Sequence, residues 1–195
     1  MPYRTILMFG PPGSGKGTWG NVLKQIPGMY HFSSGDMFRA LDPSSPMGKM
    51  TLDSIRDGEL VPDEHAVELW RERMKRLVDF GEFDPENQYL ILDGLPRTST
   101  QVGMVEDDLD VQVIVALDCP DRDVLVQRLY RRALMQHRAD DAKEETILKR
   151  FEIYDAMTEG VLQHYPEDLI HVVDVSQPTP RILADISQAL VDHLG

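Results

Sequence analysis

Residues 10–18 read GPPGSGKGT, a glycine-rich stretch that ends in Lys16, Gly17 and Thr18. The apolar run at 3–9 predicts a buried strand before it, and residues 16–25 predict a helix after it. Glycines let backbone amides turn toward an anion, and the helix N-terminus adds a partial positive charge. A strand, a glycine-rich loop and a helix in this order indicate a phosphate-binding loop for a nucleoside triphosphate. Lys16 would reach the β- and γ-phosphates.

The residue after the lysine differs from the commonest form of this loop. That form has Ser or Thr directly after the lysine, where the hydroxyl holds Mg²⁺. Here Gly17 follows Lys16, and the hydroxyl comes one residue later, at Thr18. We therefore expect no protein side chain to bind Mg²⁺ directly, and expect phosphates and water to hold it.

Apolar runs and helical patterns alternate along the rest of the chain. Further strands are predicted at 29–32, 89–92, 111–117 and 169–173. Helices are predicted at 36–41, 47–57, 62–80, 98–106, 121–135, 144–164 and 180–194. This alternation favours an α/β fold in three layers, with a central parallel five-stranded sheet between helices, in a single domain of residues 1–195. Two polar stretches, 34–61 and 136–143, are expected to move independently.

The composition indicates in which cellular compartment the protein is expected and whether it is expected to interact with membranes. Cys119 is the only cysteine, so no intramolecular disulfide can form and a reducing compartment is expected. The N-terminus does not resemble a signal peptide, and no apolar run is long enough to span a bilayer. We therefore expect a cytoplasmic protein that does not interact with membranes.

The charge pattern argues against nucleic acid and draws attention to arginine. The formal net charge is −13, which repels nucleic acid at long range, so no nucleic-acid partner is expected. The cations are 14 Arg and 6 Lys. The arginine fork suits phosphate, so a local cluster can hold a polyanion. The alternative for any single arginine is an ordinary surface ion pair, which is common and weak.

Four further motifs follow the glycine-rich loop. They are SSGDMFR at 33–39, GELVPD at 58–63, LDGLPRTSTQ at 92–101 and RADDAKEETILKR at 138–150. Together with residues 10–18 they resemble, in order and over nearly the whole chain, the nucleoside monophosphate kinases of the adenylate kinase type with a short lid. The resemblance implies a kinase core with a helical monophosphate-binding insertion at 33–62 and a short lid at 132–143.

The resemblance also implies which residues bind ATP and AMP. For ATP they are Gly13, Ser14, Gly15, Lys16, Gly17, Thr18, Arg132 and Gln177. For AMP they are Ser34, Arg39, Glu59, Leu60, Val61, Gly94, Leu95, Pro96, Arg97, Gln101, Arg138 and Arg150. Within these sets, Arg39 and Arg97 hold the phosphate of AMP, and the Gln101 amide contacts the edge of the adenine.

The implied reaction is reversible Mg²⁺-dependent transfer of a phosphate from ATP to AMP, giving two ADP. Its catalytic cations would be Lys16, Arg97, Arg128, Arg132, Arg138 and Arg150. Asp93 would lie near the water shell of Mg²⁺, the expected cofactor. A phosphate acceptor is largely ionised at pH 7, so no general base is needed. With one cysteine, the four-cysteine zinc lid of some relatives is excluded, and a monomer is expected.

Four departures from the family pattern and two alternatives remain. Leu95 stands where Phe is common, and Trp19 stands where Gln is common. Gln177 stands where some relatives carry Gly, and His137 stands where Gly is usual, which would stiffen the lid hinge. UMP or CMP is the nearest alternative acceptor, although Gln101 and the GELVPD segment favour adenine. A nucleotide-dependent switch is the alternative from another class. Switches that bind GTP need an Asn-Lys-x-Asp motif, and Asn21 and Asn87, the only asparagines, do not form one.

Overall fold

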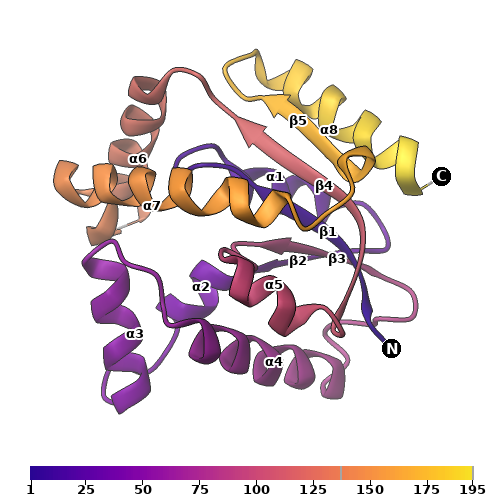
Figure 1. Cartoon of the computed structure of the whole chain (residues 1–195), viewed down its shortest axis with the longest axis horizontal. Helices are drawn as coiled ribbons and strands as arrows, with labels where there is room; N and C mark the ends of the chain where they lie inside the picture. Colours follow the sequence, from indigo (N-terminus) through magenta and orange to yellow (C-terminus); the bar gives the residue numbers. More distant parts are fainter. Residues whose placement is uncertain (137, 195) are drawn as a thin grey trace.

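A parallel sheet of five strands lies at the centre of the molecule, in the order β2-β3-β1-β4-β5 (Figure 1). The computed structural model describes residues 1–136 and 138–194. The strands are β1 (Tyr3–Phe9), β2 (Met29–Ser33), β3 (Tyr89–Asp93), β4 (Leu109–Asp118) and β5 (Ile170–Asp174). Every neighbouring pair is parallel. The predicted α/β fold with five parallel strands is confirmed.

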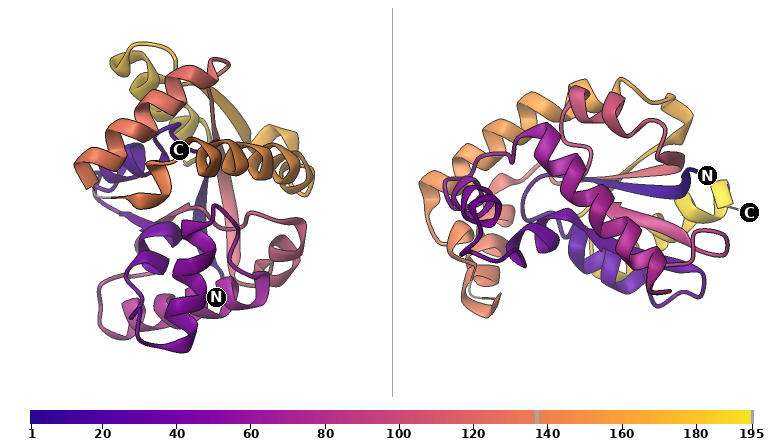
Figure 2. Two further views of the ribbon diagram at one scale, coloured as in Figure 1. Left: turned by 90° about the vertical axis from the view of Figure 1, so that its left-hand side faces the viewer. Right: turned by 90° about the horizontal axis from the view of Figure 1, so that it is seen from below.

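Helices connect the strands, as parallel pairing requires. They are α1 (Lys16–Leu23), α2 (Ser34–Arg39), α3 (Pro46–Arg56), α4 (Asp63–Asp79), α5 (Ser99–Val105), α6 (Arg122–Gln136), α7 (Glu144–Leu162) and α8 (Thr179–Leu194). Two short 3₁₀ turns, η1 (Ala139–Asp141) and η2 (Glu167–Leu169), precede α7 and β5. Figure 2 shows the helices on both sides of the sheet. None of the described helices is long and apolar enough to cross a membrane.

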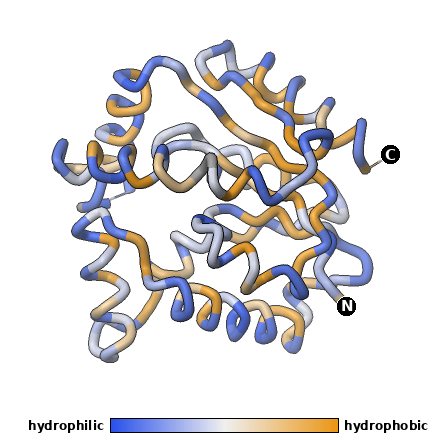
Figure 3. Tube along the Cα trace, in the orientation of Figure 1, coloured by the Kyte–Doolittle hydropathy of each residue, from blue (hydrophilic) through white to orange (hydrophobic). Residues whose placement is uncertain are grey.

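The two faces of the sheet form two separate hydrophobic cores. In β1, Leu7 and Phe9 belong to one core, while Ile6 and Met8 belong to the other, as the two-residue period of a strand requires. The first core packs against α4 and α5, and the second against α1, α6 and α8. Figure 3 shows the alternation of hydrophobic and hydrophilic residues along α4. Trp19 is buried in the second core, directly behind the glycine-rich loop.

Several predicted helix boundaries differ from the structure by two residues, and the start of α2 has an identifiable reason. Residues 36–41 were predicted as a helix, but α2 begins at Ser34 and ends at Arg39. The Ser33 hydroxyl accepts a hydrogen bond from the Asp36 amide and so sets the earlier start. Helix α1 ends at Leu23, two residues before the predicted end at 25. By contrast, α4 differs from the predicted 62–80 by a single residue at each end.

The carboxyl ends of the strands point toward one side of the molecule, where α2, α3 and α6 lie (Figure 1). In a parallel sheet this edge is where ligands bind, because the loops that leave the strands gather there. The loop after β1 is the glycine-rich stretch, and the loop after β3 carries the LDGLPRTSTQ motif. Two motifs far apart in the sequence therefore come together at one edge.

Candidate active site

The glycine-rich loop folds tightly between β1 and α1. Gly13 has φ +85°, and a Cβ there would lie 2.8 Å from the Leu125 carbonyl oxygen, so only glycine fits. The Lys16 ammonium donates hydrogen bonds to the carbonyl oxygens of Gly10 (2.5 Å) and Pro11 (3.2 Å). Gly15 precedes α1 and has no side chain with which to cap its first amides. The loop therefore presents a lysine and a helix N-terminus, which together suit a phosphate.

The loop after β3 is built around a second glycine with a left-handed backbone. Gly94 has φ +87°, and a Cβ there would lie 2.5 Å from the Ser34 hydroxyl and 2.9 Å from Arg97. The bond between Leu95 and Pro96 is cis. The Arg97 guanidinium donates to the Gly94 carbonyl at 2.8 Å. This loop thus brings the Ser34 hydroxyl, from α2, and the Arg97 guanidinium close to the same glycine.

Two carboxylates of η1 hold three arginines in place, one each from α2, α6 and α7. Asp140 accepts from Arg39 (2.8 Å) and Arg150 (3.0 Å). The fully buried Asp141 accepts from Arg132 through both oxygens (2.6 and 2.9 Å) and from Arg150 (2.6 Å). Hydrogen bonds between ionised groups are among the strongest in proteins. Three of the predicted phosphate-binding arginines are therefore oriented by two acidic residues that we did not predict.

A second ion pair joins the lid to the monophosphate-binding insertion. Arg138 donates to Asp36 of α2 at 2.8 Å, and Arg39 of α2 pairs with Asp140 of η1. In one pair the arginine belongs to the lid and the carboxylate to α2, and in the other pair the two positions are exchanged. The expected influence of His137 on the lid hinge concerns a position outside the described residues.

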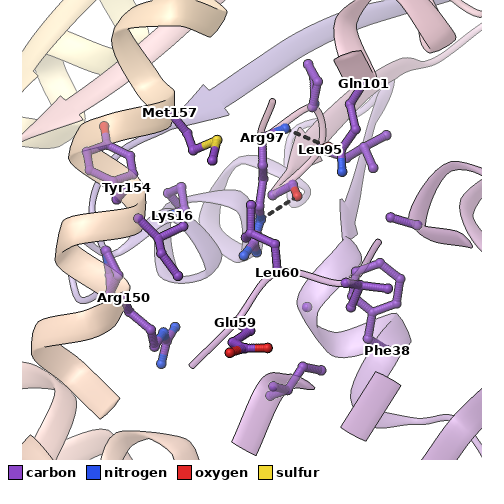
Figure 4. Close-up of a pocket in the computed structure, with 18 of the residues that line it drawn as sticks. Lys16, Phe38, Glu59, Leu60, Leu95, Arg97, Gln101, Arg150, Tyr154 and Met157 are labelled. Atoms are coloured by element: carbon purple, nitrogen blue, oxygen red, sulfur yellow. Dashed lines mark hydrogen bonds between the residues drawn. The ribbon is translucent and has the colours of Figure 1, made fainter. Parts of the chain in front are cut away.

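A pocket opens between these elements (Figure 4). All the residues predicted for AMP line it, except Ser34 and Arg138, and Lys16 reaches it from the phosphate loop. Part of its apolar wall was not predicted, namely Phe38, Ile55, Ala66, Ile153, Met157 and Val161. The helical period of α7 brings Arg150, Tyr154 and Met157 to the pocket (Figure 4). That spacing from Arg150 was the feature of the sequence from which Met157 could have been predicted to line the pocket.

Positive charge is concentrated in this pocket. Burial and the charges of Arg97, Arg132 and Arg150 lower the pKa of Lys16 from 10.5 to about 8, although Asp93 opposes the shift. Burial, with Arg150 and Arg39 nearby, lowers the pKa of Arg97 to about 10. The protein therefore holds these cations where an anionic ligand would stabilise them.

Three buried polar atoms of the site have no partner within the described part of the chain. They are the hydroxyls of Ser14 and Ser34 and the Nε of Arg39. Buried polar groups are normally hydrogen-bonded, so atoms of this kind at a pocket indicate positions that a ligand satisfies. All three belong to residues that were predicted to bind nucleotide.

Arg128 lies apart from the other predicted cations. Its guanidinium donates to the Val175 carbonyl at 2.9 Å, in the loop between β5 and α8. Gln177, predicted to bind ATP, belongs to the same loop and donates to the Asp174 carbonyl at 3.2 Å. Arg128 therefore contacts the loop that contains Gln177, whereas Arg132 and Arg150 pair with Asp141.

A parallel sheet with a phosphate loop after β1 and an arginine-lined pocket beside it is the arrangement expected of the nucleoside monophosphate kinase class. The family pattern described as "Adenylate kinase" matches residues 8–170. The chain is 34% identical over 189 residues to "Adenylate kinase 1" of Schistosoma mansoni. The alignment covers 96% of this chain and 92% of that protein. It is also 35% identical over 196 residues to an "Adenylate kinase" of Cyanothece sp., and the alignment covers 97% of this chain and 95% of that protein. The chain belongs to the adenylate kinase family.

Proposed function

We propose that this chain reversibly transfers the γ-phosphate of Mg²⁺-ATP to AMP and forms two ADP. The supporting observation is that one pocket receives Lys16 from the phosphate loop, Arg97 from the loop after β3, Arg39 from α2 and Arg150 from α7. A protein that only binds or hydrolyses a triphosphate has no need of a second set of cations. Transfer between two phosphates requires positioning and neutralisation of charge, which these four residues supply.

In this proposal an oxygen of the AMP phosphate attacks the γ-phosphorus of ATP. The new P–O bond forms as the bond from that phosphorus to the β-phosphate oxygen breaks, and the β-phosphate oxygen leaves with the electron pair. Arg39 and Arg97 hold the AMP phosphate, and Lys16 neutralises the β- and γ-phosphates. Arg132 and Arg150 stabilise charge on the group in transfer, with Arg138 approaching from the lid.

The proposed ATP site combines the phosphate loop with the loop after β5. The amides of residues 13–18 hold the triphosphate, and Arg128 and Gln177 lie where the adenine would extend. Arg128 therefore acts at the nucleoside end of ATP in this proposal, which revises its expected place among the transferred phosphates. The contact between Arg128 and the Val175 carbonyl supports the revision.

Mg²⁺ fits the carboxylate at the end of β3. Asp93 is buried, and a Cβ on Gly17 would lie 3.7 Å from its Oδ2, so the carboxylate lies directly beside the phosphate loop. Among the described residues, no group of three or more His, Cys, Asp or Glu side chains forms a metal site. We propose that Asp93 accepts hydrogen bonds from water on Mg²⁺. Bound in this way, Mg²⁺ supplies positive charge to the triphosphate.

The choice of AMP rests on the Gln101 amide, which lines the pocket beside Val61 and Leu95. The test is the rate of ADP formation from ATP with AMP, UMP or CMP at equal concentrations. We expect AMP to be the best acceptor. Faster turnover of UMP or CMP would assign the enzyme another acceptor, and no transfer to any of the three would favour the nucleotide switch.

The roles of two cations can be tested directly. Lys16→Ala and Arg97→Ala should each lower kcat by about 10²–10³, because each removes a charge aimed at the reacting phosphates. Arg56→Ala is a matched control, because Arg56 pairs with Asp53 and Asp57 on the exposed surface of α3. Near-normal kcat for either site variant would refute its assigned role.

We further propose that the insertion at 33–62 and the lid at 132–143 close over bound nucleotides, which excludes water as a competing acceptor. The ion pairs from Arg39 to Asp140 and from Arg138 to Asp36 join these two segments, which supports an arrangement in which they meet over the nucleotides. We also propose a monomer, for which a mass of 22.2 kDa in light scattering is the expected result.

A further inference from the structure

The side chain of Gln101 is held at two points within a small hydrogen-bonded cluster that also holds its backbone amide. Its Nε2 donates to Asp63 Oδ1 at 2.9 Å, and its Oε1 accepts from the Arg97 amide at 2.7 Å (Figure 4 shows the second bond). The Gln101 backbone amide donates to the Thr98 hydroxyl at 3.0 Å. That hydroxyl in turn donates to Asp63 Oδ2 at 2.9 Å.

These contacts leave only one orientation for the amide. An ionised carboxylate offers acceptors alone, so the NH₂ end of Gln101 must face Asp63. A backbone N–H is a donor, so the oxygen end must face Arg97. Turning the amide over would place oxygen against oxygen at Asp63 and hydrogen against hydrogen at Arg97. Since Gln101 is only 2% exposed, water cannot compensate for either clash.

We infer that Asp63 is a positioning residue that sets the acceptor-base preference of the enzyme through Gln101. This inference rests on the proposed function. One N–H of the Gln101 amide is bonded to Asp63, and one lone pair of its oxygen is bonded to the Arg97 amide. One further N–H and one further lone pair of Gln101 therefore remain, in a fixed order. Adenine carries an amino donor beside a ring-nitrogen acceptor, which matches an amide donor and acceptor.

Guanine is the base that this order rejects. It has the size of adenine but carries a carbonyl oxygen where adenine carries the amino group. The Gln101 oxygen would then face another oxygen, and a polar pair left unmatched in a buried site is costly. Because AMP and GMP carry the same phosphate and ribose, the ratio of their kcat/KM values isolates the contribution of the base.

The position of Asp63 explains how it reaches Gln101. Asp63 is the first residue of α4 and lies two residues after Val61, in the segment that lines the pocket with Glu59, Leu60 and Val61. Thr98 and Gln101 lie at the start of α5. One carboxylate therefore joins the GELVPD motif to the LDGLPRTSTQ motif, and it does so behind the pocket wall.

The test compares Asp63→Ala, Asp63→Asn and Glu64→Ala with the wild type, using AMP and GMP as acceptors. In Asp63→Ala we expect the AMP-to-GMP ratio of kcat/KM to fall about tenfold or more, because Gln101 loses a bond to a charged group. In Asp63→Asn we expect most of the ratio to be retained. The new side-chain oxygen can accept from Gln101 while its nitrogen donates to the Thr98 hydroxyl. KM for ATP should stay within about twofold throughout.

Glu64→Ala is the matched control, because Glu64 is the exposed acidic neighbour in the same first turn of α4. It removes one negative charge from that turn and should leave the AMP-to-GMP ratio unchanged. Each variant is also measured for its thermal midpoint. If Asp63→Ala does not fold, Asp63→Ser carries the same comparison, since a serine hydroxyl is too short to reach Gln101 and Thr98 together.

Two results would overturn the inference. Equal losses with AMP and GMP in Asp63→Ala would show that Asp63 serves only the stability of α4. A wild-type enzyme that transfers no phosphate to AMP, or prefers UMP or CMP, would overturn the proposed function and this inference with it. The first result leaves the proposed function intact, so the two failures are distinguishable.

Discussion

Lys16 should lose its charge at an unusually low pH, and the efficiency with ATP should follow that loss. The pKa of Lys16 is lowered from 10.5 to about 8, first by burial and then by the neighbouring arginines. A shift of this size corresponds to about 3 kcal/mol in favour of the neutral amine. Because the pKa is lowered, the charge is present below pH 8 and is lost as the pH rises through 8.

The expected size of the effect follows from this titration. At pH 9 about one lysine in ten would remain charged, whereas a lysine with an ordinary pKa would remain almost fully charged. The value of kcat/KM for ATP reports the free enzyme, so it should fall about tenfold from pH 7 to pH 9. At saturating ATP the bound phosphates stabilise the ammonium, and kcat should fall only at higher pH.

The assay is the initial rate of ADP formation against ATP at fixed saturating AMP, from pH 6.5 to 10. Lys16→Arg is the control, because a guanidinium stays charged over this range. Its kcat/KM will be lower at pH 7 but should not show the step near pH 8. A wild-type kcat/KM for ATP that stays flat up to pH 9.5 would refute the reasoning, as would the same step in Lys16→Arg.

Two further predictions concern packing and motion. Gly20→Ala should destabilise the protein by about 1–3 kcal/mol, because a Cβ there would overlap the half-buried His31 ring. Gly103→Ala, where a Cβ meets no described atom within 4 Å, should instead stabilise by up to about 1 kcal/mol; thermal midpoints that move the same way in both would contradict this. The distance between spectroscopic labels that replace Arg138 and a residue beside Lys16 should shorten when ATP and AMP analogues bind together. An equal distance in both states would exclude closure of the lid.

Local sequence patterns were sufficient to predict the strands of the sheet and the phosphate loop. The apolar runs of the strands and the stripe of α4 follow from periodicity, because burial on one or both faces leaves a regular pattern. The loop at residues 10–18 was identifiable because its glycines are needed for backbone shape, and Gly13 lies against a carbonyl oxygen that no side chain could approach. Such constraints are visible in the amino-acid sequence itself.

The partners of the arginines were not predictable in the same way. Arg39 and Asp140 are 101 positions apart, and only the folded chain brings them together. Arg128 and Arg132 share a face of α6, so helical spacing alone could not show that one faces Val175 and the other Asp141. A single hydroxyl, that of Ser33, decided the start of α2. Contacts of this kind depend on tertiary structure and not on local pattern.

The place of β1 in the sheet affects how freely different parts of the site can open. As the middle strand, β1 is paired on both edges and buried on both faces, so its amides can exchange with solvent only when most of the domain unfolds. The phosphate loop directly follows this strand, whereas the lid connects α6 to α7 outside the sheet. The lid can therefore open locally, many times for each global unfolding event, without loosening the loop that holds the triphosphate.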